Sequence, residues 1–135
     1  MPVFTLSGTA DAPVEDVWKL LFDPSRFPEW WSGIETVEVD GPGSYTQWLS
    51  AYPDFPMPQA LRSDRSSGRI TISCQVRDVD IAWRLAADGP RAAVEVQVTV
   101  GESAADRTEM LRGMLTGAMA GLVALAEREH SGAAP

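Results

Sequence analysis

The feature that most constrains the fold is a change in hydrophobic period late in the chain, from two residues to about 3.6. Residues 69–77 and 94–100 place apolar side chains at every second position, which is typical of strands with one buried face. Residues 104–129 then carry leucine and alanine at spacings of four and three, which predicts one amphipathic helix about 39 Å long. A lone helix of that length must bury its apolar stripe, and the concave face of a bent antiparallel sheet can cover it.

The N-terminal part predicts one strand followed by two short helices. Residues 3–10 alternate like a strand, and residues 13–22 switch to helical spacing, with Pro13 suited to the first helical position. A second helix start follows at Asp23 and Pro24. Pro28 cannot donate a backbone hydrogen bond, so residues 24–31 should form a short, irregular element that Gly33 ends.

The middle of the chain predicts a series of strands. Residues 35–40 and 44–52 flank the turn sequence GPG and should form a hairpin. Residues 52–58 contain three prolines, so we expect a loop or an irregular sheet edge there. Further strands are expected at 59–65, 69–77, 81–85 and 94–100. With the first strand, these segments make seven.

Composition limits the classes of function. The 135 residues fit one domain, expected over residues 1–130 with a flexible tail at 131–135. A net charge of −8 disfavours nucleic acids and anionic membranes as partners. One cysteine and one histidine exclude an internal disulfide and the usual zinc clusters, and we expect no cofactor. With no signal-peptide pattern and no apolar run near 20 residues, a cytoplasmic location is expected.

The order of elements, together with the stretches DAPVEDVWKLLFDPSRFPEWW, IETVEVDGPG and WRL, resembles the START-like SRPBCC superfamily. The likeness covers residues 3–129 and is greatest to the polyketide cyclase/dehydrase branch. It implies an α+β helix-grip fold, in which a curved antiparallel sheet of six to seven strands wraps around the C-terminal helix. It also implies a cavity for a hydrophobic or aromatic small molecule. The superfamily includes aromatase/cyclases, lipid and quinone carriers and chaperone activators, so the resemblance leaves catalysis and carriage open.

The adjacent tryptophans Trp30 and Trp31 bear on that cavity. Neighbouring helical residues point about 100° apart, so both cannot bury into one core face. If Trp30 packs on helix 13–22, Trp31 is left near the rim where the family's cavity opens. The alternative is that both indoles are core residues.

Further candidates for the cavity wall come from the strands and the long helix. Trp48 shares an expected strand face with Thr46, Ser50 and Tyr52, a mixed set that suits a wall. For Trp83, Met110 and Met114, core filling is an equal or better account. Gly117 either leaves space for a ligand or lets the helix approach the sheet. The predicted ligand-binding set is Trp31, Trp48, Tyr52, Met57, Trp83, Met110, Met114 and Gly117.

Catalytic residues are weakly indicated. A cyclase needs one group to take a proton from carbon and another to polarise a carbonyl. Arg62 and Tyr52 are the candidates, while His130 lies in the expected tail and Cys74 faces the core. The sequence thus predicts binding of a hydrophobic or aromatic molecule, with a cofactor-independent polyketide cyclase/dehydratase as the enzymatic form. The alternatives are a lipid or quinone carrier and a protein-interaction module similar to the chaperone activators; a homodimer stays open.

Overall fold

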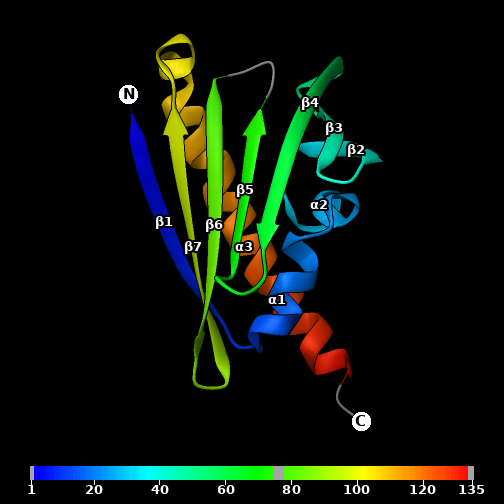
Figure 1. Ribbon diagram of the computed structural model, residues 1–135, viewed down its shortest axis with the longest axis vertical. Coiled ribbons are helices and arrows are strands. Elements are labelled where there is room, and N and C mark those ends of the chain that lie inside the picture. The colour runs from blue at the N-terminus through cyan, green and yellow to red at the C-terminus, as the bar shows by residue number, and fades with distance from the viewer. Residues whose placement is uncertain (1, 75–77, 134–135) are drawn as a thin grey trace.

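The computed structural model describes residues 2–74 and 78–133, and its centre is one antiparallel sheet of seven strands (Figure 1). The strands are β1 (Val3–Ala10), β2 (Ile34–Gly41), β3 (Ser44–Leu49), β4 (Tyr52–Asp64), β5 (Arg69–Cys74), β6 (Val79–Asp88) and β7 (Arg91–Val100). Their order across the sheet is β1-β7-β6-β5-β4-β3-β2, so the first strand closes one edge beside the last. The predicted fold class and strand number are confirmed.

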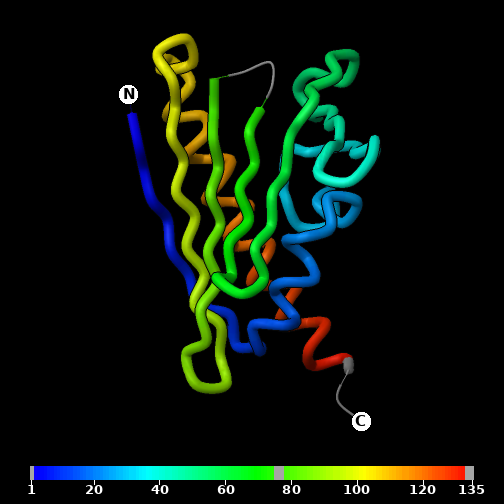
Figure 2. Tube along the Cα trace, viewed as in Figure 1, coloured from blue at the N-terminus to red at the C-terminus, as the bar shows by residue number. Residues whose placement is uncertain are grey.

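The helices lie on one side of this sheet. They are α1 (Val14–Leu21), η1 (Pro24–Arg26), α2 (Phe27–Trp30), η2 (Glu102–Arg107) and α3 (Thr108–Ala133), where η marks a 3-10 helix. Figure 1 shows α3 running behind the sheet, with α1 and α2 beside its C-terminal half. The trace in Figure 2 shows the β6–β7 hairpin extending beyond the other strands. The long helix therefore forms the second layer, as the sequence predicted.

The structure changes two predicted boundaries. Residues 52–58 were expected as a loop or an irregular sheet edge; they are not a loop but the first half of β4, which continues to Asp64. The prolines are accommodated because this half pairs with β3, while the described pairs with β5 begin at Gln59. The helix expected at 104–129 begins as the 3-10 turn η2 and reaches Ala133. Residues 75–77, expected to continue β5, lie outside the described residues.

The stripe of α3 that faces the sheet is fully buried. Leu115, Ala118, Leu122 and Ala126 have no exposed surface and pack in the same cluster as the inner residues of β7. By length and composition alone, the helical segment Glu102–Gly132 is apolar enough to span a membrane. The sequence prediction counted only uninterrupted apolar runs and so missed this property. In the fold, the buried stripe of the helix is in contact with protein.

Ion pairs attach the C-terminal end of α3 to the first helices. Arg26 contacts both Glu29 and Glu129, and these hydrogen bonds hold the pKa of each carboxyl group below its usual value. His130 Nδ1 lies 2.9 Å from Asp16 Oδ2 of α1. His130, which the sequence analysis placed in the tail, belongs to α3, and a side chain of α1 contacts it. The first three residues of the predicted tail are helical.

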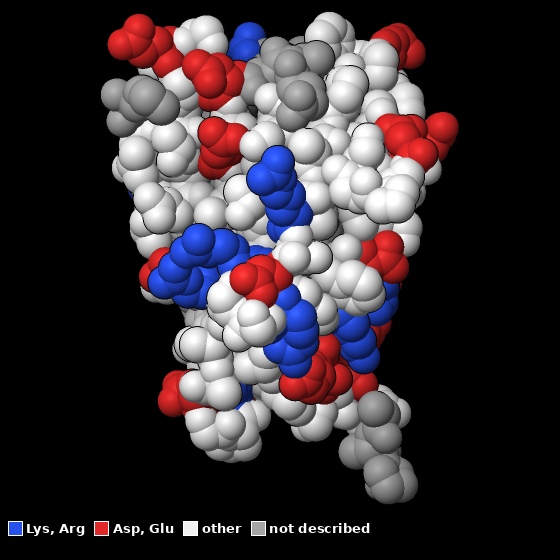
Figure 3. Space-filling view, viewed as in Figure 1, with Lys and Arg blue, Asp and Glu red and all other residues white. Residues whose placement is uncertain are grey.

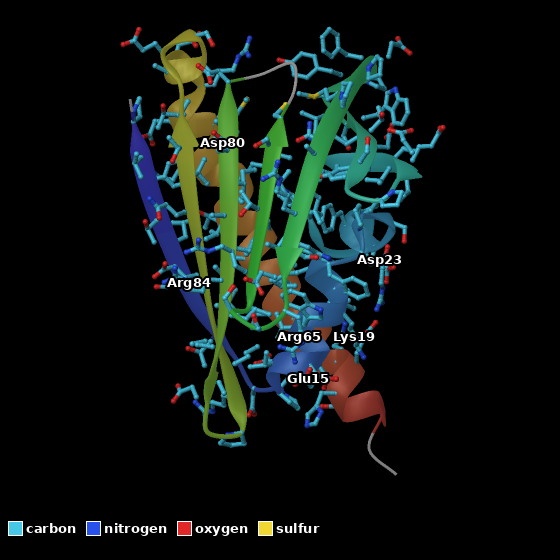
Figure 4. All side chains as sticks on the ribbon, in the orientation of Figure 1. Glu15, Lys19, Asp23, Arg65, Asp80 and Arg84 are labelled. Carbon is cyan, nitrogen blue, oxygen red and sulfur yellow. The ribbon has the colours of Figure 1, made fainter. Side chains whose placement is uncertain are left out.

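A second contact attaches the β4–β5 turn to α1. Arg65 forms an ion pair with Glu15 (Figure 4), and its guanidinium carbon lies 5.2 Å from the centre of the Trp18 ring.

The sheet face turned away from α3 carries Arg84 and Asp80 (Figure 4), and basic side chains gather over its lower half (Figure 3). The space between the sheet and α3 is therefore the first place to look for an apolar binding site.

Candidate functional site

The space between sheet and helices is closed at one end by five aromatic side chains: Phe27, Trp30, Trp31, Tyr45 and Trp83. All are buried, and their contacting rings have centroids 5.3–5.8 Å apart. Trp30 packs back onto α1, as the first of the two alternatives had it, with its Nε1 donating to the carbonyl oxygen of Leu20 at 3.2 Å. Both indoles are buried, contrary to the helical argument, because the backbone of Trp31 is extended (φ −94°, ψ 91°) and turns its side chain inward.

Beyond Trp31, an enclosed space of about 70 Å³ remains, which we call the cavity. It lies between the first half of α3 and the inner face of β3 to β6. Its wall consists of Trp31, Gln47, Leu49, Tyr52, Met57, Gln59, Cys74, Val79, Ile81, Ala104, Arg107, Met110, Leu111, Met114 and Leu115. A dry cavity of about 150 Å³ holds one benzene, and common ligand sites exceed about 300 Å³. The cavity in this form is therefore too small for an aromatic ring unless its wall moves.

Exposure of the wall residues shows where the cavity opens. Tyr52 and Met110 are 47% and 53% exposed, whereas Trp31, Met57 and Leu115 are buried. Tyr52 comes from the start of β4 and Met110 from the first turn of α3, so the mouth lies between these elements. An unbranched methionine at the mouth can change rotamer at little cost. The mouth is thus the part of the wall that can widen.

Polar groups in the wall are few, and two of them are the amides of Gln47 and Gln59. Gln59 is 4% exposed, and its Nε2 donates weakly to the carbonyl oxygen of Met57 at 3.3 Å and to Cys74 Sγ at 3.1 Å. Gln47 stands on the neighbouring strand, opposite Met57. Tyr45 lies on the same face of β3 as Gln47 and is buried. This burial raises the pKa of its hydroxyl above the usual value, with the nearby Cys74 as a smaller cause. Tyr45 therefore remains a neutral phenol at physiological pH.

Trp31 contributes an unsatisfied donor. Its Nε1 is buried and has no hydrogen-bond partner among the described residues, and the same holds for Trp83. A buried N–H without an acceptor costs about 1–3 kcal/mol. Of these two tryptophans, only Trp31 belongs to the cavity wall.

The structure brings together five of the predicted ligand-binding residues: Trp31, Tyr52, Met57, Met110 and Met114 all line the cavity. Trp48 does not. The inner face of β3 carries Tyr45, Gln47 and Leu49, so the half-buried Trp48 between Gln47 and Leu49 points to the other face. The predicted phase of this strand was wrong by one residue.

Three other candidates also lie outside the cavity wall. Trp83 is fully buried in the aromatic end of the core. Arg62 is exposed on the outer sheet face, opposite Thr71 of β5 and next to the inward Leu61. A Cβ at Gly117 would meet only Ser32 Cβ, at 4.0 Å, whereas one at Gly121 would collide with the carbonyl oxygen of Trp30. Gly121 thus serves close packing of α3 on α2.

Sequence reasoning missed the polar wall residues Gln47, Gln59 and Arg107. The two glutamines follow from the correct strand phase, since each lies two residues from a buried neighbour, Tyr45 or Met57. Arg107 could have been found from helical spacing, because it precedes Met110, Leu111 and Met114 by three, four and seven residues. The sequence prediction counted only apolar residues on this helix face and therefore left Arg107 out.

The sheet wrapped around a long helix, with a cavity enclosed between them, defines a helix-grip domain of the START type. The chain belongs to the family described as "Polyketide cyclase / dehydrase and lipid transport", whose model matches residues 1–127. The resemblance seen in the sequence is confirmed. Among curated proteins, no sequence matches this chain.

Solved structures show the same fold at low identity. XoxI from Bacillus cereus has a TM-score of 0.77 at 15% identity, covering 93% of this chain and 95% of its own. The Zhui aromatase/cyclase from Streptomyces sp. R1128 has a TM-score of 0.75 at 16% identity, covering 94% of both chains. A START superfamily protein from Mycobacterium smegmatis has a TM-score of 0.71 at 12% identity, covering 91% of this chain and 97% of its own. These likenesses establish the fold, and the family supports a role in binding hydrophobic molecules.

Proposed function

We propose that the protein binds a small, largely apolar molecule in the cavity between α3 and the inner face of the sheet. The observation that carries the proposal is an enclosed apolar space, bounded by Trp31, Met57 and Leu115, that opens through two exposed side chains. Apolar burial at about 25 cal/mol per Å² supplies the affinity, and the few polar groups set the orientation of the ligand. Membership of a family that includes lipid transport supports the same role.

A polyketide cyclase/dehydratase is the second candidate, favoured by the family and by aromatase/cyclases of the same fold. The polar groups of the wall are better suited to donating hydrogen bonds to a ligand than to taking a proton from carbon. The single histidine, the usual proton acceptor, is paired with Asp16 at the far end of α3. Within the wall, a proton-transfer role would fall to Tyr52 or Cys74. We therefore place binding ahead of catalysis.

The test uses N-phenyl-1-naphthylamine, a neutral apolar dye whose fluorescence rises in apolar surroundings. Ala104 is 1% exposed and lines the cavity, so Ala104→Leu adds three carbon atoms to the space. Ala105 is exposed and outside the wall, and Ala105→Leu is the matched control. We expect dye affinity to fall at least about tenfold with Ala104→Leu, which is the loss of some 1.4 kcal/mol of contact, and to stay unchanged with Ala105→Leu.

Urea denaturation of both variants checks that the domain remains folded. Ala104→Leu should cost no more than about 1–3 kcal/mol, the usual range for an overpacked core. The proposal fails if the dye does not bind to the wild-type protein, or if the two variants bind it equally well.

A further inference from the structure

One basic side chain, Arg107, lines the apolar cavity without a counter-charge. It ends η2, and its side chain is half-buried in the cavity wall. Among the described residues, it has no ion pair and no hydrogen bond. A half-buried cationic side chain beside an apolar wall is usually paired with a carboxylate, so an unpaired one at this position is unusual.

The other half-buried basic side chains in the described part of the chain each meet a carboxylate. Lys19 contacts Asp16, Arg26 contacts Glu29 and Glu129, and Arg112 contacts Glu109. Acidic residues are abundant, with nineteen Asp and Glu against eleven Lys and Arg. Carboxylates are therefore abundant in this protein, but no described carboxylate forms an ion pair with Arg107.

The position of Arg107 along the helix places it near the mouth. Met110 follows it by three residues, so the two side chains are neighbours on one helical face, and Met110 is 53% exposed. The half-buried wall residues Leu111 and Met114 continue that face. The cavity thus has a cationic group at its opening and an apolar interior, which matches the two ends of an amphiphile.

We propose that the natural ligand is an amphiphilic monoanion, with a carboxylate or similar acidic group held by Arg107 at the mouth and its apolar body in the cavity. A guanidinium binds a carboxylate through two parallel N–H···O bonds and favours this head group over a neutral one. The wall includes no aspartate or glutamate among the described residues, so the anion meets no like charge there. The inference rests on the proposed function and adds the chemical class of the ligand.

The experiment compares two dyes that differ in one group. 1-Anilinonaphthalene-8-sulfonate carries an acidic group, and N-phenyl-1-naphthylamine is the same ring system without it. Wild-type protein should bind the sulfonate about tenfold or more tightly than the neutral dye, since hydrogen bonds between charged groups contribute that much. Displacement of the neutral dye by decanoate and by 2-naphthoate, each against its methyl ester, then shows whether the apolar body is aliphatic or aromatic.

Three variants assign the effect to Arg107. Arg107→Gln should remove the preference for the sulfonate, so that the two dyes bind with about equal affinity, and Arg107→Lys should retain part of the preference. Arg128→Gln is the control, because Arg128 is an exposed residue of α3 outside the wall and its loss changes net charge equally.

The outcomes separate the two proposals. If both dyes bind equally and Arg107→Gln changes neither affinity, the anion inference is wrong while the apolar cavity stands. The inference is also overturned if Arg128→Gln weakens sulfonate binding as much as Arg107→Gln, because the effect would then be one of overall charge. If neither dye binds, the proposed function itself fails.

Discussion

The glycines of α3 offer a direct test of how closely this helix must approach its neighbours. Gly113 is exposed, and a Cβ there would have no atom within 4 Å. At Gly121 a Cβ would overlap the carbonyl oxygen of Trp30 and lie 3.1 Å from its carbonyl carbon. The same substitution, glycine to alanine, therefore meets open solvent at one site and fixed backbone at the other.

The magnitudes follow from two opposing effects. Alanine in a helix interior is favoured over glycine by about 1 kcal/mol, so Gly113→Ala should stabilise the protein by roughly that amount. At Gly121 the same gain is outweighed, because the backbone of α2 cannot rotate away and α3 must shift from the aromatic core. Overpacking costs about 1–3 kcal/mol or more, and we expect a net loss of about 2 kcal/mol for Gly121→Ala.

Thermal and urea denaturation of the two variants measure the difference directly. A gap of about 3 kcal/mol corresponds to roughly 12 °C in Tm for a domain of this size. Gly117→Ala is an internal control and should resemble Gly113→Ala, because its Cβ would make only an ordinary contact with Ser32. Should Gly121→Ala prove as stable as Gly113→Ala, the glycine is not required for helix packing and the reasoning is refuted.

Two further predictions concern the ion pairs and the cavity wall. Arg26→Met should lower stability by about 1 kcal/mol at pH 7. The lowered pKa values of Glu29 and Glu129 mean that this contribution is present above pH 4.5 and is lost as the pH falls below it, so urea denaturation at pH 3 should show a smaller difference. A constant difference from pH 7 to pH 3 would contradict this account. Trp48→Ala should leave the affinity for N-phenyl-1-naphthylamine within about twofold, because its indole lies on the face of β3 away from the cavity, while Met114→Trp should abolish binding. If a fluorescence titration shows that both variants lose dye affinity equally, Trp48 is part of the cavity wall and the assigned strand phase is wrong.

The sequence by itself determined the secondary elements and their order. Alternating residues in β5 and β7 and the spacing of Leu115, Ala118 and Leu122 in α3 are local patterns, and burial of apolar surface enforces them wherever the element packs. The extents of β4 and α3 were misjudged. The prolines of β4 still allow its first half to pair with β3, and the 3-10 turn η2 precedes α3.

The tertiary structure alone decided which residues share the cavity. The wall draws on Trp31 after α2 and on β3, β4, β5, β6, η2 and α3, and its members meet only when the sheet bends around the helix. The sequence prediction assigned the inner face of β3 one residue out of phase. It therefore placed Trp48 in the wall instead of Gln47 and Leu49, because successive side chains of a strand point to opposite faces. The extended backbone at Trp31 and the close approach of Trp30 to Gly121 depend on contacts between distant segments, which no local pattern encodes. The sequence thus determined that a helix would be held against a sheet, and packing decided which side chains leave space between them.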